Sequence, residues 1–339
     1  MKAVVLVGGE GTRMRPLTET VPKPLLPLVD RPILDHVLDH LVAHGVEEVV
    51  MSSPYLEATF EPFIAARGGS PAILWVTERE PLGTGGAIVN VLDWLGDEPF
   101  LALNGDILTD LDLGALMARH RERGAVATIA LHHVDDARPF GLVETDRDGR
   151  VTAFREKPPD PVAADINAGT YVLEPSALSG WPRETFVWIE GEVFPSLIAD
   201  GALVLGHPSD AYWLDLGTPA QYLRAHADLL GRRVGGHAYA APWIDPGAEV
   251  AVSATVAPDV AVGARSVVGP GARVRGSVLL PAARIDPGAR VEGSVLGPKA
   301  EVGSEATVLD SVLGEGARVL PGATLRDVRV PAGAVAEPV

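Results

Sequence analysis

Short apolar runs alternate with stretches of helical apolar spacing over the first part of the chain. The pattern predicts strands at 4–7, 48–51, 72–76 and 99–103, and helices at 33–44, 56–66 and 86–95. Gly45 is placed to end the first helix, whose residues His36, His40 and His44 are expected to form one polar face. Such alternation is typical of an α/β domain with a mainly parallel sheet, in which ligands bind where the strands end.

Two further features delimit this first domain. Between 126 and 172 the apolar runs are shorter and the turns denser, which indicates an antiparallel insertion forming a second wall of a cleft. The domain is expected to end near Leu230, because the glycine-rich stretch 231–236 predicts a linker. We therefore expect a first domain over 1–232 and a second over 240–339.

The second domain carries one aliphatic residue at every sixth position. The uninterrupted series is Ile244, Val250, Val256, Val262, Val268 and Val274. The phase then resets for the pairs Ile285 and Val291, Val302 and Val308, and Val319 and Leu325. Small residues and prolines lie between them. This period predicts a parallel β-helix whose coils stack their aliphatic residues, whereas the alternative, a disordered tail, would not keep them in register.

Composition excludes several classes of function. The chain of 339 residues has a formal net charge of −17, so it lacks the basic footprint of a nucleic-acid reader. It contains no cysteine, which excludes disulfides, thiolate metal sites and cysteine nucleophiles. No apolar run is long enough for a membrane span, and the short apolar N-terminus continues directly into a glycine loop. We therefore expect a cytoplasmic protein that does not bind membranes.

The loop after the first strand is the first candidate for chemistry. It contains Gly8, Gly9 and Gly11, followed by the cations Arg13, Arg15 and Lys23. Backbone N–H groups of a glycine loop can approach phosphate oxygens closely. The loop matches neither the dinucleotide fingerprint nor the P-loop. Fixed cations beside it favour phosphoryl or nucleotidyl transfer, in which charge stabilisation dominates, and the alternative is a tight turn with solvated basic residues.

Acidic residues at strand ends are the second candidate. Asp106 follows an apolar strand and Asp215 ends another short apolar run, so the two carboxylates could share one Mg²⁺ ion. For Asp215 the role of N-cap for a helix beginning near Pro219 is an equal alternative. Glu156 can accept hydrogen bonds from sugar hydroxyls and Lys157 can pair with a phosphate. Taken alone, that pair is better interpreted as a surface salt bridge.

Seven motifs in order together resemble the sugar-1-phosphate nucleotidylyltransferases, most closely the mannose-1-phosphate guanylyltransferase branch with a left-handed β-helix tail. They lie at 8–23, 81–86, 103–106, 140–144, 154–158, 166–169 and 213–219. They span essentially the whole of the first domain, and the tail fits as well. The resemblance implies a Rossmann-like nucleotidyltransferase domain with a mainly parallel mixed sheet, followed by a left-handed parallel β-helix of hexapeptide repeats.

The resemblance also implies a reaction and a role for each matching residue. A sugar 1-phosphate would attack the α-phosphorus of an NTP, with Mg²⁺, and release pyrophosphate; the nucleophile is already an anion, so no general base is needed. The implied catalytic residues are Arg13, Lys23 and Asp106, and the implied metal ligands are Asp106 and Asp215. The implied nucleotide-binding residues are Gly8, Gly9, Gly11, Thr12, Gly83 and Gly85. The implied sugar-phosphate-binding residues are Gly141, Glu156, Lys157 and Asn167.

The choice of base and sugar depends on two segments of the chain. By the family pattern the loop before Gly83 meets the base, and there Glu78 and Glu80 can accept hydrogen bonds from guanine N1–H and N2, which favours GTP over dTTP; solvated glutamates are the alternative. Trp188 replaces a small polar residue near the expected sugar pocket. Mannose 1-phosphate is the expected sugar. The alternatives are thymidylyl or uridylyl transfer to glucose 1-phosphate, and guanylyl transfer to another sugar-like (cyclitol) phosphate.

Other classes fit less well. Hexapeptide β-helices also occur in acyltransferases with a catalytic histidine, but no histidine follows His237. A non-catalytic regulatory subunit would be expected to lack one of the signature cations or metal carboxylates, and all are present here. Because a β-helix leaves strand edges at its end coils, we expect a homo-oligomer formed through the tail.

Overall fold

The computed structural model describes residues 1–54, 57–155 and 160–336. The chain forms two compact units. One comprises residues 1–9 and 37–213, and the other comprises residues 10–36 and 214–339. The boundary therefore passes through the glycine loop, after Gly9.

The first unit is built on a nine-stranded sheet with the order β10-β9-β11-β6-β1-β4-β5; β8 pairs with β11, and β12 pairs with β8. Its strands are β1 (Lys2–Leu6), β4 (Glu48–Ser53), β5 (Ala72–Thr77), β6 (Phe100–Asn104), β8 (Ala127–Val134), β9 (Leu142–Thr145), β10 (Val151–Arg155), β11 (Ala164–Leu173) and β12 (Val204–Ser209). The strands β6, β1, β4 and β5 are parallel, so their carboxyl ends lie at one edge. The four strands predicted for this region are confirmed.

The apolar pattern of β1 explains its central place in this sheet. Val4 pairs with Val50 of β4 on one side and with Ala102 of β6 on the other. All three are completely buried. A strand buried on both faces needs a continuous apolar run, and residues 3–5 supply it. Consequently the glycine loop that follows β1 is held at the carboxyl edge by a rigid core strand.

The helices agree with the predicted ones except in one region. They are α1 (Ile33–Ala43), α2 (Glu57–Ala66), α3 (Gly83–Asn90), α4 (Leu92–Leu95), α5 (Leu113–Arg123), α6 (Phe194–Ala199) and α7 (Pro219–Leu230). The short strands outside the main sheet and the β-helix are β2 (Pro27–Leu28), β3 (Arg31–Pro32), β7 (Ile107–Thr109) and β13 (Trp213–Asp215). Of these elements, β2, β3 and α7 belong to the second unit. The helix predicted at 86–95 begins earlier and is interrupted at Val91, whose dihedral angles of −112° and 6° are not helical. Glycines at its start made the beginning hard to recognise.

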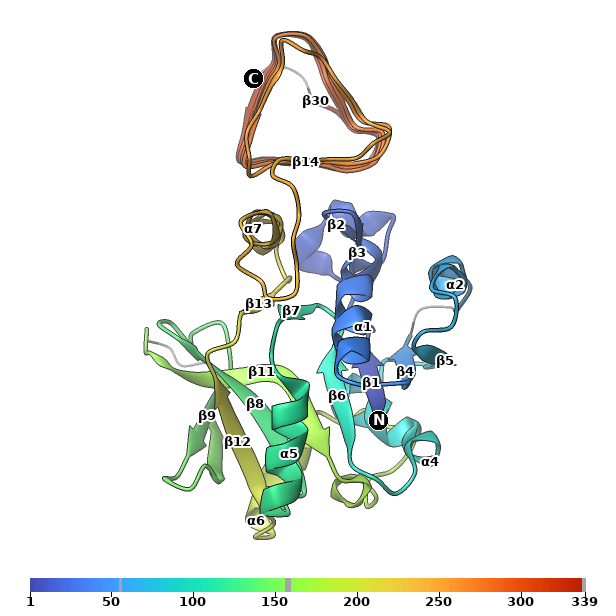
Figure 1. Ribbon diagram of the computed structural model, residues 1–339, viewed down its shortest axis with the longest axis vertical. Coiled ribbons are helices and arrows are strands. Elements are labelled where there is room, and N and C mark those ends of the chain that lie inside the picture. The colour runs from blue at the N-terminus through green and yellow to red at the C-terminus, as the bar shows by residue number, and fades with distance from the viewer. Residues whose placement is uncertain (55–56, 156–159, 337–339) are drawn as a thin grey trace. The chain divides into compact units, whose positions relative to one another are not determined.

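The antiparallel strands between 126 and 172 extend the main sheet, whereas the sequence predicted a separate second wall of the cleft. The long strand β11 pairs antiparallel with β6 on one side and with β8 on the other. Strands β9 and β10 form an antiparallel pair beyond it, and α5 packs on β8 and β11 (Figure 1). The reason is that β11 is ten residues long and almost entirely buried, so it completes the core beside β6.

In the second unit, residues 243–336 form the predicted parallel β-helix, consistent with a left-handed one. Three sheets of short parallel strands make its faces. Figure 1 looks down the axis of the β-helix, so that its coils superpose as a triangle. The strands are β14 (Trp243–Ile244), β15 (Glu249–Val250), β16 (Thr255–Val256), β17 (Ala261–Val262), β18 (Val267–Val268), β19 (Arg273–Arg275), β20 (Val278–Leu279), β21 (Arg284–Ile285), β22 (Arg290–Glu292), β23 (Val295–Leu296), β24 (Glu301–Val302), β25 (Thr307–Leu309), β26 (Val312–Leu313), β27 (Arg318–Val319), β28 (Thr324–Arg326), β29 (Arg329–Val330) and β30 (Val335–Ala336).

The resets of the hexapeptide phase correspond to a shorter coil. Ile244 pairs with Val262, 18 residues later, but Val262 pairs with Leu279 and Leu279 with Leu296, each 17 residues later. One of the three corners of each later coil is therefore one residue shorter. The aliphatic residues still stack in an apolar interior, since Val262, Leu279 and Leu296 are nearly completely buried.

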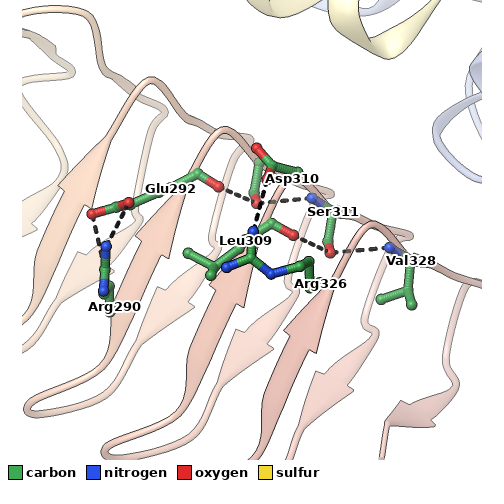
Figure 2. Close-up of polar contacts among 8 residues, drawn as sticks. Arg290, Glu292, Leu309, Asp310, Ser311, Arg326 and Val328 are labelled. Carbon is green, nitrogen blue, oxygen red and sulfur yellow. Dashed lines mark hydrogen bonds and ion pairs between the residues drawn. The ribbon is translucent and has the colours of Figure 1, made fainter.

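A ladder of buried serines occupies this shorter corner. Ser277, Ser294 and Ser311 repeat at the coil spacing, and each hydroxyl donates to the carbonyl two residues earlier at 2.7 Å. Each hydroxyl also accepts the backbone N–H of the next coil, from Ser294, Ser311 and Val328 at 3.1, 3.0 and 3.2 Å. Figure 2 shows the contacts of Ser311 with Leu309 and Val328. The ladder thus satisfies the backbone groups that the tight corner removes from the sheets.

One buried histidine corrects the expectation of a polar helix face. His36 is only 2% exposed, and its Nε2 lies 2.9 Å from the carbonyl of Leu28. Burial lowers the pKa of His36 to about 4, and burial lowers the pKa of His226, in α7, to about 4 as well. Both rings are therefore neutral core residues at neutral pH. Spacing along the helix could not reveal that Leu28 and the ring of His237, 5.2 Å from that of His36, cover the start of α1.

We predict that Ser294→Ala lowers the free energy of unfolding by about 1–3 kcal/mol, because the N–H of Ser311 loses its buried acceptor. Chemical denaturation followed by circular dichroism measures the change. Ser304→Ala, at a half-buried serine of the same β-helix, is the control and should stay within about 0.5 kcal/mol of the native chain. Equal effects of the two substitutions would contradict the structural role of the ladder.

Candidate functional site

An open cleft lies at the carboxyl edge of β1, β4 and β6 in the first unit. Its lining includes Gly8 and Gly9 after β1, Glu78 after β5, Gly83 at the start of α3, and Asp106 after β6. Five predicted site residues, which are scattered between positions 8 and 106, therefore surround one cleft. The parallel strands bring them together, since the loops after neighbouring parallel strands emerge at the same edge.

Gly105 sets the position of Asp106 in this cleft. The N–H of Gly105 donates to the carbonyl of Leu6 at 2.9 Å. A Cβ atom on Gly105 would lie 2.9 Å from the Cγ1 of Val7, closer than side chains tolerate. Only glycine lets the loop after β6 approach β1 so closely. The half-buried carboxylate of Asp106 is thereby fixed beside the glycine loop.

Glu78 anchors the loop between β5 and α3. It is only 6% exposed, and its two carboxylate oxygens accept hydrogen bonds from the Ser52 hydroxyl at 2.8 Å and the Leu82 N–H at 3.0 Å. Its side chain faces the cleft with one acceptor site on each oxygen already used. Glu80, by contrast, is exposed and is not part of the described lining. The two glutamates predicted together thus have different environments.

The glycines of α3 serve a close approach within the protein. The N–H groups of Gly85 and Gly86 donate to the carbonyl of Val187 at 2.9 and 3.2 Å. A Cβ atom on Gly86 would lie 2.3 Å from the carbonyl oxygen of Thr185. Gly85, which was predicted to bind nucleotide, is buried, and its N–H is used in this internal contact. Gly83 and Thr84 of the same motif do line the cleft.

A hydrogen-bond network connects α3 with the strand that carries Asn167. Thr84 Oγ1 donates to one oxygen of Glu190 at 3.2 Å, and Tyr171 Oη donates to the other at 3.1 Å. Asn167 Nδ2 donates to Tyr171 Oη at 2.8 Å, while its Oδ1 accepts the N–H of Gly169 at 2.9 Å. Burial raises the pKa of Tyr171 well above its usual value, so the phenol remains a donor. Asn167 is therefore held in one orientation.

Glu190 is a member of this network that the sequence reasoning missed. It lies two residues after Trp188, the residue that was expected near the sugar pocket. Trp188 is 44% exposed and is not among the described lining of the cleft; its ring packs on Gly191, where a Cβ atom would lie 2.1 Å from the ring. Phe186, which was not predicted either, lines the cleft.

The remaining predicted sugar-phosphate residues lie at two places. Gly141 precedes β9, and its carbonyl accepts the N–H of Asn167 at 3.5 Å, so these two predicted residues are neighbours. Glu156 and Lys157 lie outside the described residues. The structure therefore brings together Gly141 and Asn167 of the predicted set of four.

In the second unit, two cations converge on one carboxylate. Lys23 Nζ lies 3.9 Å from one oxygen of Asp215, and Arg13 Nη2 lies 3.9 Å from the other. The Lys23 side chain is only 8% exposed, whereas the Arg13 side chain is 67% exposed. We call these three residues the charged triad. It has an excess of positive charge, and the exposed guanidinium is its accessible member.

Glycines and a capping threonine shape the surroundings of the charged triad. Gly11 has a φ of +61°, and a Cβ atom there would lie 3.0 Å from the Cγ2 of Thr18. A Cβ atom on Gly217 would lie 2.6 Å from Arg13 Nη2. The N-cap of α7 is Thr218, whose hydroxyl accepts the N–H of Gln221 at 3.3 Å. Asp215 is therefore not the N-cap, which removes the alternative reading of that residue.

Known proteins resemble both parts of the chain. A family model described as nucleotidyl transferase matches residues 2–232, and one described as GMPPB C-terminal domain matches residues 239–336. Mannose-1-phosphate guanylyltransferase of Mycobacterium tuberculosis is 41% identical over 84% of this chain and 81% of its own length. A probable mannose-1-phosphate guanylyltransferase 3 of Oryza sativa subsp. japonica is 35% identical over 84% and 82%. Among solved structures, HddC from Yersinia pseudotuberculosis complexed with GMP-PN has a TM-score of 0.57 and 26% identity, covering 66% of this chain and 97% of that chain.

We predict that Gly86→Ala destabilises the first unit by about 1–3 kcal/mol, because the added methyl group must displace the backbone at Thr185. Thermal unfolding followed by scanning calorimetry tests this. Gly180→Ala is a matched control, since nothing lies within 4 Å of the added atom. The close approach of α3 to 185–187 would be refuted by a melting temperature of Gly86→Ala equal to that of the control.

Proposed function

The chain belongs to the nucleotidyl transferase family, and from that premise we propose that it transfers a guanylyl group from GTP to mannose 1-phosphate, yielding GDP-mannose and pyrophosphate. The single observation that carries the reaction type is the charged triad, in which Arg13 and Lys23 converge on Asp215 beside a glycine loop. The substrate pair is supported by the relatives named mannose-1-phosphate guanylyltransferase, which match both domains.

The proposed chemistry is an in-line displacement at the α-phosphorus. An oxygen of the sugar phosphate forms the new P–O bond while the bond to the pyrophosphate oxygen breaks, and the leaving group carries away its electron pair. The nucleophile is an anion at neutral pH, so no side chain has to remove a proton. The task of the protein is therefore to hold the two anions together and to neutralise the charge that shifts onto pyrophosphate.

The phosphate-binding roles follow from position and charge. We propose that the backbone N–H groups of Gly8, Gly9, Gly11 and Thr12 bind the nucleotide phosphates, together with Gly83 of the cleft lining. Arg13 stabilises the α-phosphate and the leaving pyrophosphate through its exposed guanidinium, which is suited to bind phosphate in a bidentate manner. Lys23 is nearly buried and acts as a fixed point charge. Gly85 is retained only as a packing residue of this motif, since its N–H is already bonded.

Nucleotidyltransferases of this family generally use a divalent metal ion, and we propose Mg²⁺ with Asp106 and Asp215 as its protein ligands. Their oxygens are the donors that Mg²⁺ prefers, and this ion usually binds through one or two carboxylates with phosphate and water completing its shell. That matches a chain whose described residues contain no cluster of three potential metal ligands. Bound there, the ion would neutralise phosphate charge. The chain's own part is to present the two carboxylates at strand ends.

For the sugar phosphate, we propose that Asn167 and Gly141 bind the sugar hydroxyls, with Glu156 as a further acceptor and Lys157 as the partner of the 1-phosphate. The network through Tyr171 and Glu190 supports this assignment for Asn167, because it fixes the amide before a ligand arrives. Pre-organised polar groups lose less entropy on binding. Glu190 joins the proposed sugar site as an addition to the predicted set.

For the base, we propose guanine, in keeping with the GMP-PN complex of HddC. Glu78 lines the cleft, and each of its carboxylate oxygens retains one acceptor position beyond the hydrogen bond it accepts from the protein. It is the better candidate for guanine N1–H and N2. Glu80 is exposed and is kept as a second candidate.

The proposal also covers organisation, location and assembly. Catalysis is assigned to residues 1–232 and the β-helix to residues 240–339. None of the helices in the described part of the chain is long and apolar enough to cross a membrane. We propose that the enzyme acts in the cytoplasm and forms a homo-oligomer through its tail, without a nucleic-acid partner.

The substrate assignment predicts turnover restricted to one pair. Pyrophosphate release measured for GTP, dTTP, UTP, ATP and CTP against mannose 1-phosphate and glucose 1-phosphate should be largest for GTP with mannose 1-phosphate. We expect every other pair to have a kcat/KM at least about tenfold lower, because mispaired polar groups in a site cost at least that much. A preference for dTTP or UTP would overturn the guanine assignment and leave the family reaction intact.

The same assay checks the catalytic assignment. Asp106→Asn should lower kcat at least about 100-fold, since the amide is a poor ligand for Mg²⁺ and the negative charge is lost. Asp97→Asn, at an exposed aspartate of the same unit, is the control and should retain normal activity. Near-normal turnover of a folded Asp106→Asn variant would refute the role of Asp106.

A further inference from the structure

Within the second unit, the last coils of the β-helix contact residues 13–20, in the loop that follows the glycines. Arg329, the first residue of β29, donates from Nη1 to the carbonyl of Arg13 at 2.9 Å and to that of Arg15 at 3.0 Å. The N–H of Ala332 donates to Glu19 at 3.4 Å. Two segments at opposite ends of the sequence are thus bonded to each other.

A third contact lies on the coil below. The carboxylate of Glu315 accepts a hydrogen bond from the Thr20 hydroxyl, and the neighbouring Lys299 ammonium, 2.8 Å away, is the main reason why the pKa of Glu315 is lowered. Glu315 is stacked beside residue 332, since its carbonyl accepts the N–H of Gly333 at 2.8 Å. The last coils of the β-helix therefore hold residues 13–20 at several points.

Arg329 acts on the part of the loop that carries the phosphate-binding guanidinium. The 3₁₀ turn Thr12–Met14 uses the carbonyls of Gly11 and Thr12 for its own hydrogen bonds, at 2.9 and 3.2 Å. The carbonyls of Arg13 and Arg15 are instead bonded by Arg329. The main chain of Arg13 is thus fixed by the β-helix, while its side chain reaches Asp215 at 3.9 Å.

Neighbouring arginines of the β-helix differ from Arg329 in their partners. Arg326 pairs with Asp310 at 3.8 Å, as Figure 2 shows, and Arg318 pairs with Glu301 at 3.2 Å. Both partners belong to adjacent coils of the β-helix itself. Such exposed pairs contribute little to stability. Arg329 bonds to main-chain carbonyls of the loop, so its substitution should affect that loop more than the β-helix.

We propose that Arg329 is a positioning residue for nucleotidyl transfer, which sets the direction of the Arg13 guanidinium by holding the Arg13 and Arg15 carbonyls. The inference rests on the proposed function. It gives the β-helix a part in the reaction besides assembly. Because Arg13 is assigned to the leaving pyrophosphate, its orientation matters most in the transition state, and losing it should lower kcat rather than substrate affinity.

The test compares Arg329→Met, which keeps the apolar stem and removes the donors, with the control Arg326→Met. We expect kcat of Arg329→Met to fall about tenfold, with KM for mannose 1-phosphate within about twofold, as for a lost transition-state interaction. Arg326→Met should remain within about twofold in both constants. Arg329→Lys should recover most of the loss, since a single nitrogen makes both hydrogen bonds.

Amide hydrogen exchange gives a readout that needs no turnover. The amides of residues 12–20 should exchange faster in Arg329→Met than in the native chain and in Arg326→Met, with unchanged exchange in the β-helix interior. If another nucleotide and sugar pair is the true substrate, the kinetic comparison is made with that pair; if none is turned over, exchange decides alone. Unchanged exchange at 12–20, a kcat within twofold of native, or an equal loss in Arg326→Met overturns the proposal.

Discussion

The candidate site depends on the burial of a lysine ammonium beside a strand-end carboxylate. A charge removed from water costs several kcal/mol unless an opposite charge and hydrogen bonds compensate for it. The Lys23 side chain is 8% exposed, and Asp215 lies 3.9 Å from its Nζ. The loop that contains Lys23 must therefore stay against the segment that contains Asp215. Gly11, with its positive φ, packs directly on the Lys23 stem and gives the loop the shape that this burial requires.

This constraint leaves Arg13 as the accessible charge of the triad. In a chain with a net charge of −17, a local excess of positive charge marks where a polyanion can bind. The main chain of Arg13 is bonded to Arg329 and its side chain lies near Asp215, so two independent contacts restrict Arg13. The serine ladder contributes indirectly, because it keeps the shorter coils of the β-helix in register up to Val328, next to Arg329. Stability of the tail and placement of the loop are thus connected.

The sequence predicted the parts of the fold that follow from periodicity. The strands at the carboxyl edge, the hexapeptide β-helix and the grouping of Gly8, Gly9, Gly83 and Asp106 were all accessible, since apolar runs define strands and parallel strands end together. What it could not show was how a glycine or a glutamate is used. Gly85 and Glu78 belong to a binding motif by pattern, yet their buried N–H and carboxylate bond within the protein.

Other differences arise from long-range packing. Thr84 and Tyr171 both reach Glu190 only because α3 approaches 185–189 through glycine, a contact with no local signature. His36 has a helical spacing that fits an exposed face, yet it is buried beside the Leu28 carbonyl and the His237 ring, whose centroid lies 5.2 Å away. Strands β8 to β11 have the short pattern of an insertion, but the long buried β11 makes them part of the main sheet.

The central claim, that Lys23 and Asp215 act as a unit in nucleotidyl transfer, is tested most directly by a double-mutant cycle. Lys23→Met, Asp215→Asn and the double variant are compared by kcat in the pyrophosphate assay, after calorimetry has shown that each is folded. We predict that each single variant loses at least about 100-fold and that the double variant loses no more than the worse single one, as for residues that act together. Losses that multiply in the double variant, or near-native turnover in either single one, would contradict the account.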